Sequence, residues 1–531
     1  MNNSFSTTVA TKNWGLIFCS FLFSLAALSV VANRIDFHPD EAIYLSKILP
    51  SLDNDSGLFF NAWYLGTTFG NPTPNLARFS CALLGALAIA SVTIVFVRCF
   101  PEKRRMIAIL VSLILLVSYQ GVFLIVRLRP EISWVALTAI VLAGLTILQS
   151  SPTTPLRVLT LAMLVLLPMN HRLAWIACFY IGGYLILFGR GRYGMSFTIA
   201  ALIAMPLGVL VQLGIRPWLV GEGYAIAFGK FIAPSGVGTR LPPIAFLQNV
   251  FFECSSAFND TSANRSWWNH MPRTGALNHH AVANWMWGIG CIQPMLAKTW
   301  QLRYILFAPY FFLALMYVAG YFNPTYFAIF SVFTLLGFAF LAVEFKSKTS
   351  VRWMASACVL ISVFNGASFL TTRVFNHGRA SYFDVETSLR KFVSGLPPES
   401  SIAVSERMQS IAFRHPGPRF VLYKDVVPDD IDFIVADEYD FEIYTRFISD
   451  YVEKQRKIEL AINNYKMVGA RTFPVYWRDR LLVSTAPSRY SLIQGSWFFR
   501  NSVQYRIMIL QRPEMEFLLQ PPSIFNASAT Q

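Results

Sequence analysis

The chain has 531 residues, of which 54% are hydrophobic and 14% charged, and its mean hydropathy is +0.46. Soluble globular proteins carry about 25% charged residues, so this composition excludes an ordinary soluble protein and predicts a polytopic membrane protein with a smaller soluble part. The formal net charge is +15. Much of this charge lies in short loops between apolar segments, where the positive-inside rule accounts for it, and we predict no nucleic-acid partner.

Apolar runs of about 17–23 residues, long enough to cross a bilayer, recur along the first 372 residues. We count about eleven such runs by this criterion. They cover approximately residues 14–32, 76–98, 106–123, 133–149, 157–171, 173–189, 196–214, 281–297, 304–320, 325–344 and 352–371. The sequence therefore predicts a mainly α, polytopic membrane domain over residues 1–372.

Basic residues mark alternate loops between the predicted spans. Lys103, Arg104 and Arg105 lie between the second and third spans, and Arg190 and Arg192 follow the sixth. With a cytoplasmic N-terminus these loops all fall inside, as the positive-inside rule requires. The loops outside are then approximately 33–75, 124–132 and 215–280, together with everything after residue 372. We expect a bacterial inner membrane, so that the outer face is the periplasm.

The composition changes after about residue 373, where charged residues become dense. Short runs typical of β-strands cover residues 401–405, 419–423, 431–436 and 471–477, and a helical pattern covers 441–465. Strands that alternate with helices predict an α/β domain. We therefore expect residues 373–531 to form a small extracytoplasmic α/β domain.

Two adjacent carboxylates, Asp40 and Glu41, follow the first span in the run His38-Pro39-Asp40-Glu41-Ala42-Ile43-Tyr44. Carboxylates placed this close to a membrane span are costly and are commonly functional. A positioned carboxylate can accept the proton of an attacking hydroxyl group. The pair therefore indicates acid–base chemistry at the membrane surface, and the alternative is the solvated start of a loop.

A first span followed by an outer loop that opens with Asp-Glu, with a Tyr three residues on, resembles the GT-C membrane glycosyltransferases. The likeness is to the branch of protein O-mannosyltransferases and lipid A aminoarabinose transferases. The Pro-containing stretch Gly70–Arg78, the run Arg129-Pro130-Glu131 and the run Asn323-Pro324-Thr325-Tyr326 add to the resemblance. It covers about residues 14–371. One departure is Asn71, which stands where aminoarabinose transferases carry a Lys that binds the donor phosphate.

The resemblance implies a donor in which a sugar is linked to a polyprenyl phosphate, and transfer to an acceptor at the outer face with inversion. It assigns the general base to Asp40 and its support to Glu41. The leaving phosphate needs cationic or backbone donors as its charge grows. Because Asn71 replaces the family's Lys, we expect Arg78, Arg127 and Arg129 to bind this phosphate. The acceptor stays open between lipid A, a surface polysaccharide and a protein, and membrane lipid is a further partner.

Other residues are candidates for supporting or acceptor-binding roles. The supporting candidates are His38, Tyr44, Glu131, His171 and Tyr326, and the acceptor-binding candidates are Trp267 and Trp268. Each has a structural alternative. Arg127 and Arg129 could be interfacial anchors, Glu131 a carboxylate at a helix N-terminus, and His171 a satisfied structural histidine. The two tryptophans could belong to an aromatic belt.

Two other functions compete with the glycosyltransferase. A transporter or flippase for lipid-linked sugars would place ionisable residues near the bilayer midplane, often in two similar halves. Here the charges gather in loops and the halves do not resemble each other. A non-catalytic GT-C-like scaffold of envelope glycan assembly is the second alternative, which Asn71 favours and Asp40-Glu41 opposes. Cofactors stay unknown, and a divalent cation beside the carboxylates is left open.

Overall fold

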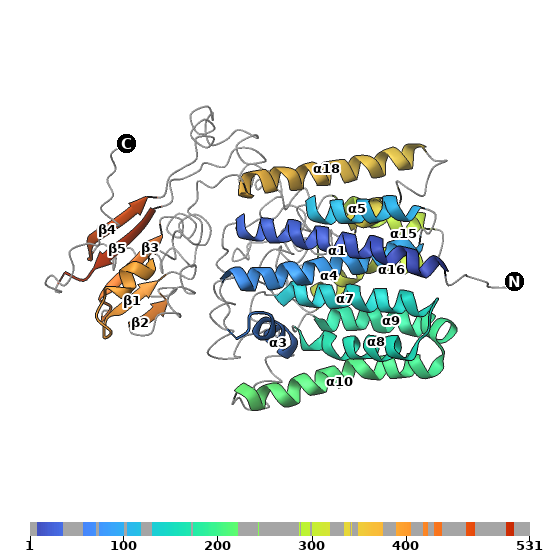
Figure 1. The fold of residues 1–531 in the computed structure, drawn as a ribbon, viewed down its shortest axis with the longest axis horizontal. Coiled ribbons are helices and arrows are strands. Elements are labelled where there is room, and N and C mark those ends of the chain that lie inside the picture. Colours follow the sequence, from blue (N-terminus) through green and yellow to red (C-terminus); the bar gives the residue numbers. More distant parts are fainter. Residues whose placement is uncertain are drawn as a thin grey trace. The chain divides into compact units, whose positions relative to one another are not determined.

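The computed structural model of the chain forms a helical unit and a unit that contains a β-sheet (Figure 1). The helical unit comprises Met1–Asn33, Ile48–Glu253 and His279–Leu370, and the second unit comprises Arg34–Lys47, Cys254–Asn278 and Thr371–Gln531. The structure describes residues 8–34, 57–70, 74–99, 103–117, 130–170, 174–220, 243, 286, 288–297, 300–318, 334–339, 341, 349–374, 389–404, 418–422, 430–437, 464–472 and 506–513.

The described part of the helical unit is built almost entirely of α-helices (Figure 1). These are α1 (Thr8–Arg34), α3 (Leu58–Thr67), α4 (Pro74–Cys99), α5 (Arg104–Val117), α7 (Pro130–Leu148), α8 (Thr154–Leu166), α9 (Ala174–Tyr193), α10 (Met195–Val220), α15 (Gln293–Leu296), α16 (Trp300–Val318) and α18 (Thr349–Val374). The 3-10 turn η2 (Leu167–Met169) continues α8, and η5 (Gly290–Ile292) precedes α15.

Among the residues that the structure describes, four helices are long and apolar enough to cross a membrane. They are Trp14–Ala32, Leu76–Arg98, Ala174–Tyr193 and Met195–Ile215, and they confirm helices at the first, second, sixth and seventh predicted spans. Shorter apolar helices lie at four more predicted spans, over Ile132–Leu148, Thr154–Met169, Leu302–Leu315 and Ser350–Phe364. The other three predicted spans lie partly outside the described residues, so the count of eleven stays a prediction.

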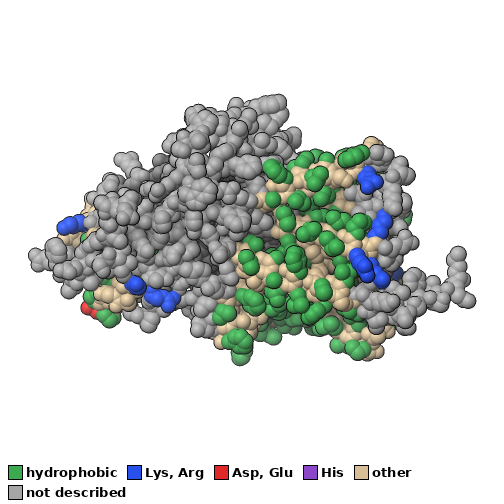
Figure 2. All heavy atoms as spheres, turned by 45° about the horizontal axis from the view of Figure 1, so that its top comes forward, with side chains coloured by type: hydrophobic (Ala, Val, Ile, Leu, Met, Phe, Trp, Pro, Cys, Tyr) green, Lys and Arg blue, Asp and Glu red, His purple; other side chains and the backbone are tan. Residues whose placement is uncertain are grey.

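Large apolar side chains are exposed along the long helices. Phe18 on α1, Leu210 on α10 and Ile186 on α9 are 60, 66 and 69% exposed. Figure 2 shows such side chains spread over the described surface of the helical unit. An apolar surface of this extent is stable against lipid rather than water. The helical unit is therefore embedded in a membrane.

The C-terminal ends of three helices meet at one end of the helical unit. Arg98 of α4 donates a hydrogen bond to Ser150 Oγ, just beyond α7. Arg192 of α9 donates to Gln149 Oε1 at 3.0 Å, and Gln149 Nε2 donates to the hydroxyl of Tyr193 at 2.9 Å. The loops that follow α4 and α9, both predicted to be cytoplasmic from their basic residues, therefore begin at the same end.

Small residues let the helices approach closely. A Cβ atom at Gly208 of α10 would lie 2.0 Å from the carbonyl oxygen of Val165 of α8. Helices α9 and α16 instead join through reciprocal hydrogen bonds. The Tyr180 hydroxyl donates to the Tyr304 carbonyl at 3.2 Å, and the Tyr304 hydroxyl donates to the Tyr180 carbonyl at 2.7 Å. Helices in lipid associate through close backbone packing and through hydrogen bonds between helices.

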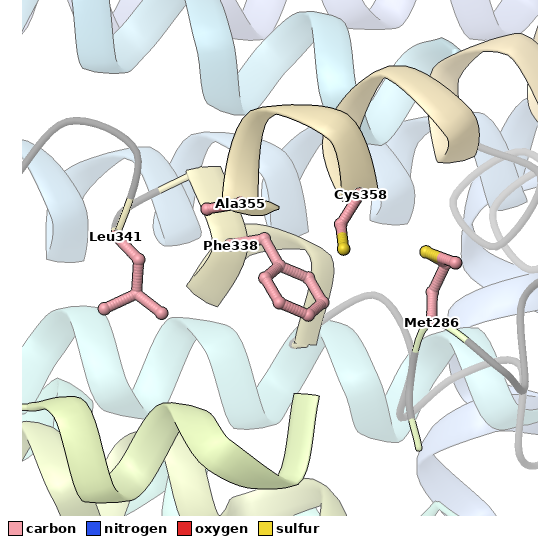
Figure 3. Close-up of a cluster of buried hydrophobic side chains, with 5 residues drawn as sticks. All are labelled: Met286, Phe338, Leu341, Ala355 and Cys358. Carbon is pink, nitrogen blue, oxygen red and sulfur yellow. The ribbon is translucent and has the colours of Figure 1, made fainter. Parts of the chain in front are cut away.

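A buried apolar cluster packs α18 against the helical residues between 334 and 341 (Figure 3). Its members are Met286, Phe338, Leu341, Ala355 and Cys358, and each is at most 8% exposed. The cluster joins the last predicted span to the tenth.

The second unit contains a five-stranded sheet of order β2-β1-β3-β5-β4. Its strands are β1 (Ser401–Val404), β2 (Arg419–Leu422), β3 (Phe433–Asp437), β4 (Lys466–Thr472) and β5 (Arg506–Gln511). Strand β1 is parallel to β2 and β3, whereas β5 is antiparallel to β3 and β4. All four residues of β1 are buried, as in parallel strands covered on both faces. Helical residues 389–394 place Phe392 edge-on against Phe433 of β3, at 5.6 Å.

Three strands lie where the sequence predicts them, at 401–405, 419–423 and 431–436. The fourth prediction is shifted, because β4 begins at Lys466 and not at Arg471. The aromatic run after residue 472 favoured the later position, whereas the observed strand contains Gly469, at a register irregularity. Strand β5 was not predicted, and residues 441–463 of the predicted helix lie outside the described part of the chain.

The Asp432 side chain makes contacts that join the ends of three neighbouring strands, β1, β3 and β5. Its Oδ2 atom accepts hydrogen bonds from the backbone N–H of Ser401 at 2.8 Å and from the Ser401 hydroxyl at 2.9 Å. The Arg512 guanidinium lies 3.8 Å from its Oδ1 atom. These contacts join the start of β1, the residue before β3 and the residue after β5.

Candidate functional site

The predicted site residues fall mostly outside the residues that the structure describes. Those outside are His38, Asp40, Glu41, Tyr44, Arg127, Arg129, His171, Trp267, Trp268 and Tyr326. For Glu131 the backbone is described, as the second residue of α7, and the side chain is not. Arg78 is described in full. The roles assigned to all of them stay predictions, and the described helices show what surrounds their positions.

Arg78 lies in the second turn of α4 and is 3% exposed. Its Nη1 atom donates a hydrogen bond to the carbonyl oxygen of Ala32, at 2.7 Å. Ala32 belongs to the last turn of α1, where carbonyl groups have no partner within the helix. The cation also faces the negative end of the helix dipole. Arg78 therefore joins α4 to the point where the chain leaves α1 for the Asp40-Glu41 segment.

Helix α3 lies within the predicted outer loop 33–75 and was not predicted. It packs on the same part of α4 that carries Arg78. The Tyr64 hydroxyl is 2.5 Å from Cys81 Sγ, and Trp63 Nε1 donates to the Ser80 carbonyl at 3.4 Å. The Thr67 and Ser80 hydroxyl groups are also hydrogen-bonded. Because Tyr64 is fully buried, α3 is an integral layer of the helical unit.

The start of α3 is fixed to two other helical elements. The backbone N–H of Gly57 donates to the Asn170 carbonyl at 2.5 Å, and the N–H of Leu58 donates to Gln212 Oε1 of α10 at 3.0 Å. A Cβ atom at Gly57 would lie 1.9 Å from the carbonyl oxygen of Met169. Glycine is therefore required for the chain to pass this close to η2.

The described contacts bring several predicted site positions to one end of the helical unit. Helices α4 and α7 are neighbours with their C-terminal ends joined by Arg98 and Ser150, so their N-terminal ends also lie together (Figure 1). This places the backbone of Glu131 at the same end as Arg78. Asn170, which directly precedes His171, reaches that end through its bond to Gly57.

The Asp40-Glu41 segment itself lies outside the described residues, between α1 and Gly57. It begins after the Ala32 carbonyl that Arg78 holds, and it returns at Gly57, where α3 starts. The Ala32 carbonyl lies beside the N-terminal part of α4, and the Gly57 backbone lies against η2 and Asn170.

Within the part of the chain that the structure describes, no group of three or more His, Cys, Asp or Glu side chains could hold a metal ion. The carboxylates of Asp40 and Glu41 are not among those residues. A divalent cation beside them stays an open question.

No family model matches the chain, and no curated protein does. Solved structures of low sequence identity are similar to it. Archaeoglobus fulgidus oligosaccharyltransferase in complex with Zn and sulfate is 12% identical with a TM-score of 0.46, and the match covers 86% of this chain and 71% of that one. The same archaeal enzyme, AglB, with an inhibitory peptide and a dolichol-phosphate is 11% identical with a TM-score of 0.45, covering 87% and 73%.

ArnT from Cupriavidus metallidurans bound to undecaprenyl phosphate is also similar. It is 12% identical with a TM-score of 0.47, and the match covers 82% of this chain and 95% of that one. These neighbours are GT-C glycosyltransferases. ArnT, a lipid A aminoarabinose transferase, represents the branch that the sequence resembles.

Proposed function

We propose that the protein is an integral membrane glycosyltransferase that moves a sugar from a polyprenyl-phosphate carrier to an acceptor at the outer face of the membrane. The observation that carries the proposal is the Asp40-Glu41 pair, which directly follows a first membrane helix in the sequence. A carboxylate at this position in the sequence would lie close to the membrane surface, where it could accept the proton of an acceptor hydroxyl group.

In the proposed reaction Asp40 takes the proton of the acceptor hydroxyl as that oxygen attacks the anomeric carbon of the donor. The bond between that carbon and the phosphate oxygen breaks, and the polyprenyl phosphate leaves with the bonding electrons. Attack from the face opposite the phosphate inverts the anomeric carbon in one displacement. Glu41 would orient Asp40, and Arg78, Arg127 and Arg129 would neutralise the leaving phosphate.

The proposal includes an arrangement in the membrane. About eleven spans would put the N-terminus in the cytoplasm and residues 373–531 outside, at a bacterial inner membrane. The outer loop 215–280, with Trp267 and Trp268, and the α/β domain are the parts that would select the acceptor. That acceptor would be lipid A, a surface polysaccharide or a protein.

The experiment compares envelope glycolipids, polysaccharides and proteins by mass spectrometry in a deletion strain complemented with variants. Asp40→Asn removes the proton acceptor with little change of shape, and losing a general base typically costs about 10²–10⁴-fold in rate. We expect a sugar-bearing product to be missing from the deletion strain and from the Asp40→Asn strain. The missing product would identify the sugar and the acceptor together.

Asp53→Asn is the matched control, because it makes the same chemical change within the same predicted loop. It should restore the wild-type profile. If Asp40→Asn restores that profile equally well, Asp40 is not the base, and a transporter or a non-catalytic scaffold becomes the better explanation.

A further inference from the structure

Two arginines from different helices bond to neighbouring residues of the connection between α7 and α8. Arg98 of α4 donates a hydrogen bond to Ser150 Oγ, and Arg192 of α9 donates to Gln149 Oε1 at 3.0 Å. Gln149 and Ser150 are consecutive residues, and consecutive Cα atoms are about 3.8 Å apart. Both guanidinium groups are therefore bonded within one short connection, and both of these acceptors are uncharged.

The Gln149 side chain is fixed by hydrogen bonds to the interior of the unit. Its Nε2 atom donates to the hydroxyl groups of Tyr193 at 2.9 Å and of Tyr184 at 3.3 Å. Both tyrosines are buried. These bonds orient the Gln149 Oε1 atom toward Arg192, so the exposed arginine has a defined position at this end of the unit. A fixed guanidinium group binds an anion at a smaller cost in side-chain entropy.

Positive charge gathers at this connection without acidic residues in the described part of the helical unit. Arg157 is the fourth residue of α8, and the first turn of that helix has no acidic residue. Residues 149–153 and 190–194 contain no Asp or Glu, and no Asp or Glu is among the side chains that the structure describes in this unit. Figure 2 shows Lys and Arg side chains along the edge of its apolar surface. An anion from outside the chain would offset their mutual repulsion.

Exposed apolar side chains lie on the same helices as these cations. Val158, which follows Arg157 on α8, is 61% exposed. On α9, Ile186 and Leu187 are 69 and 64% exposed, within two turns of Arg192. A phospholipid matches both features, because its phosphate accepts hydrogen bonds from guanidinium groups and its acyl chains cover apolar surface. A free phosphate ion would use the cations alone.

We propose that Arg98 and Arg192, at the connection between α7 and α8, bind the phosphate headgroup of an anionic glycerophospholipid. The lipid would bridge the ends of α4, α7 and α9, which these side chains already join. In the proposed orientation this end faces the cytoplasm, so the lipid belongs to the inner leaflet, and the polyprenyl-phosphate donor acts at the opposite face. The site does not depend on the proposed transfer reaction.

Native mass spectrometry of the full chain in detergent measures the binding of added lipid. Dioleoyl-phosphatidylglycerol is the anionic lipid, and dioleoyl-phosphatidylcholine, with the same acyl chains and no net charge, is the comparison. We expect wild type to bind phosphatidylglycerol about 25-fold more tightly, at about fivefold for each of two arginines. Arg192→Gln should lower the affinity for phosphatidylglycerol about fivefold and leave that for phosphatidylcholine unchanged. Arg98→Gln should act in the same way.

Arg190→Gln is the matched control, because it removes the same charge from the same last turn of α9. Of these two arginines, Arg192 makes the described bond to Gln149. Arg190→Gln should therefore bind phosphatidylglycerol as wild type does. Arg192→Lys keeps the charge and should keep most of the affinity. Arg192 is exposed, so its variants test the site without disturbing a buried contact.

Three outcomes would overturn the proposal. Equal binding of the two lipids by wild type would show that apolar contact alone holds them. Equal losses in Arg190→Gln and Arg192→Gln would reduce the effect to general positive charge. Displacement of phosphatidylglycerol by inorganic phosphate, and not by sodium chloride of equal ionic strength, would identify a site for free phosphate. Because each measurement is of binding, these outcomes leave the proposed glycosyltransferase function untouched, and an inactive protein leaves the lipid site untouched.

Discussion

Phe69 adopts a backbone conformation that is unusual for an aromatic residue. Its φ angle is +53°, and Gly70 follows with a φ of +72°, where α3 ends. The N–H of Gly70 donates to the Leu65 carbonyl at 2.9 Å, which closes the helix end by a left-handed turn. Glycine usually occupies the first left-handed position of such a turn, because any Cβ is crowded there. The Phe69 side chain is 90% exposed, so burial does not offset this strain.

Phe69→Gly should therefore stabilise the protein by about 1 kcal/mol, because it removes the left-handed strain and sacrifices little buried surface. Thermal unfolding in detergent, compared with wild type, measures the effect. Phe69→Ala is the matched control, since it removes the ring and keeps the Cβ atom. Equal stabilisation by both variants would show that the ring, and not the backbone conformation, is the source of the effect.

The sequence predicted the site at the level of residue type and not of contacts. Asp40, Glu41 and Arg78 stand out because charges near membrane spans are rare. The hydrogen-bond acceptor of Arg78 could not be predicted. Every residue has a backbone carbonyl group, so the sequence does not identify which one accepts the bond. The contact between Gly57 and Asn170 was not predictable for the same reason, because it is a hydrogen bond between two backbone groups.

Helix α3 depends on a close approach at its first turn. At Gly57 a Cβ atom would lie 1.9 Å from the Met169 carbonyl oxygen and 2.4 Å from the Met169 carbonyl carbon. Backbone atoms cannot move aside as a flexible side chain does. At Gly66, on the exposed face of the same helix, a Cβ atom would meet nothing within 4 Å.

Gly57→Ala should destabilise the protein by about 1–3 kcal/mol, the usual cost of forcing extra atoms into a packed interior. It should also separate α3 from η2. Gly66→Ala, the matched change, should be stabilising by about 0.5–1 kcal/mol, because alanine is the better helix former. Chemical unfolding in detergent would compare the two, and a neutral Gly57→Ala would contradict the close approach.

Elements were predictable from the sequence where a single local signal identified them. Long apolar runs predicted α1, α4, α9 and α10 within a few residues, because crossing a bilayer demands about 20 apolar residues. Helix α3, with 10 residues, is too short to give this signal. Strand β5 is a short apolar run whose neighbours β3 and β4 are distant in sequence, and such runs do not distinguish strand from helix.

At the scale of the whole molecule, the two ends of the helical unit differ in chemistry. The end with Arg98, Gln149 and Arg192 has exposed or half-buried cations bonded to the ends of neighbouring helices. At the opposite end the described cation, Arg78, is buried and donates a hydrogen bond to the Ala32 carbonyl. This polarity fits the proposed orientation, in which basic loops face the cytoplasm and the chemistry takes place outside.

The sequence around helix α18 predicts on which side of the membrane the residues after Val374 lie. Its 26 residues exceed the length needed to cross the hydrocarbon core, and Lys346, Lys348 and Arg352 cluster around its N-terminal end. The positive-inside rule then puts that end in the cytoplasm and residues after Val374 outside. Alkaline phosphatase, which is active only outside the cytoplasm, should therefore be active when fused after Asn376 and inactive when fused after Lys346. The reverse pattern would invert the whole molecule and place Asp40 in the cytoplasm, and activity at both positions would show that α18 does not cross the membrane.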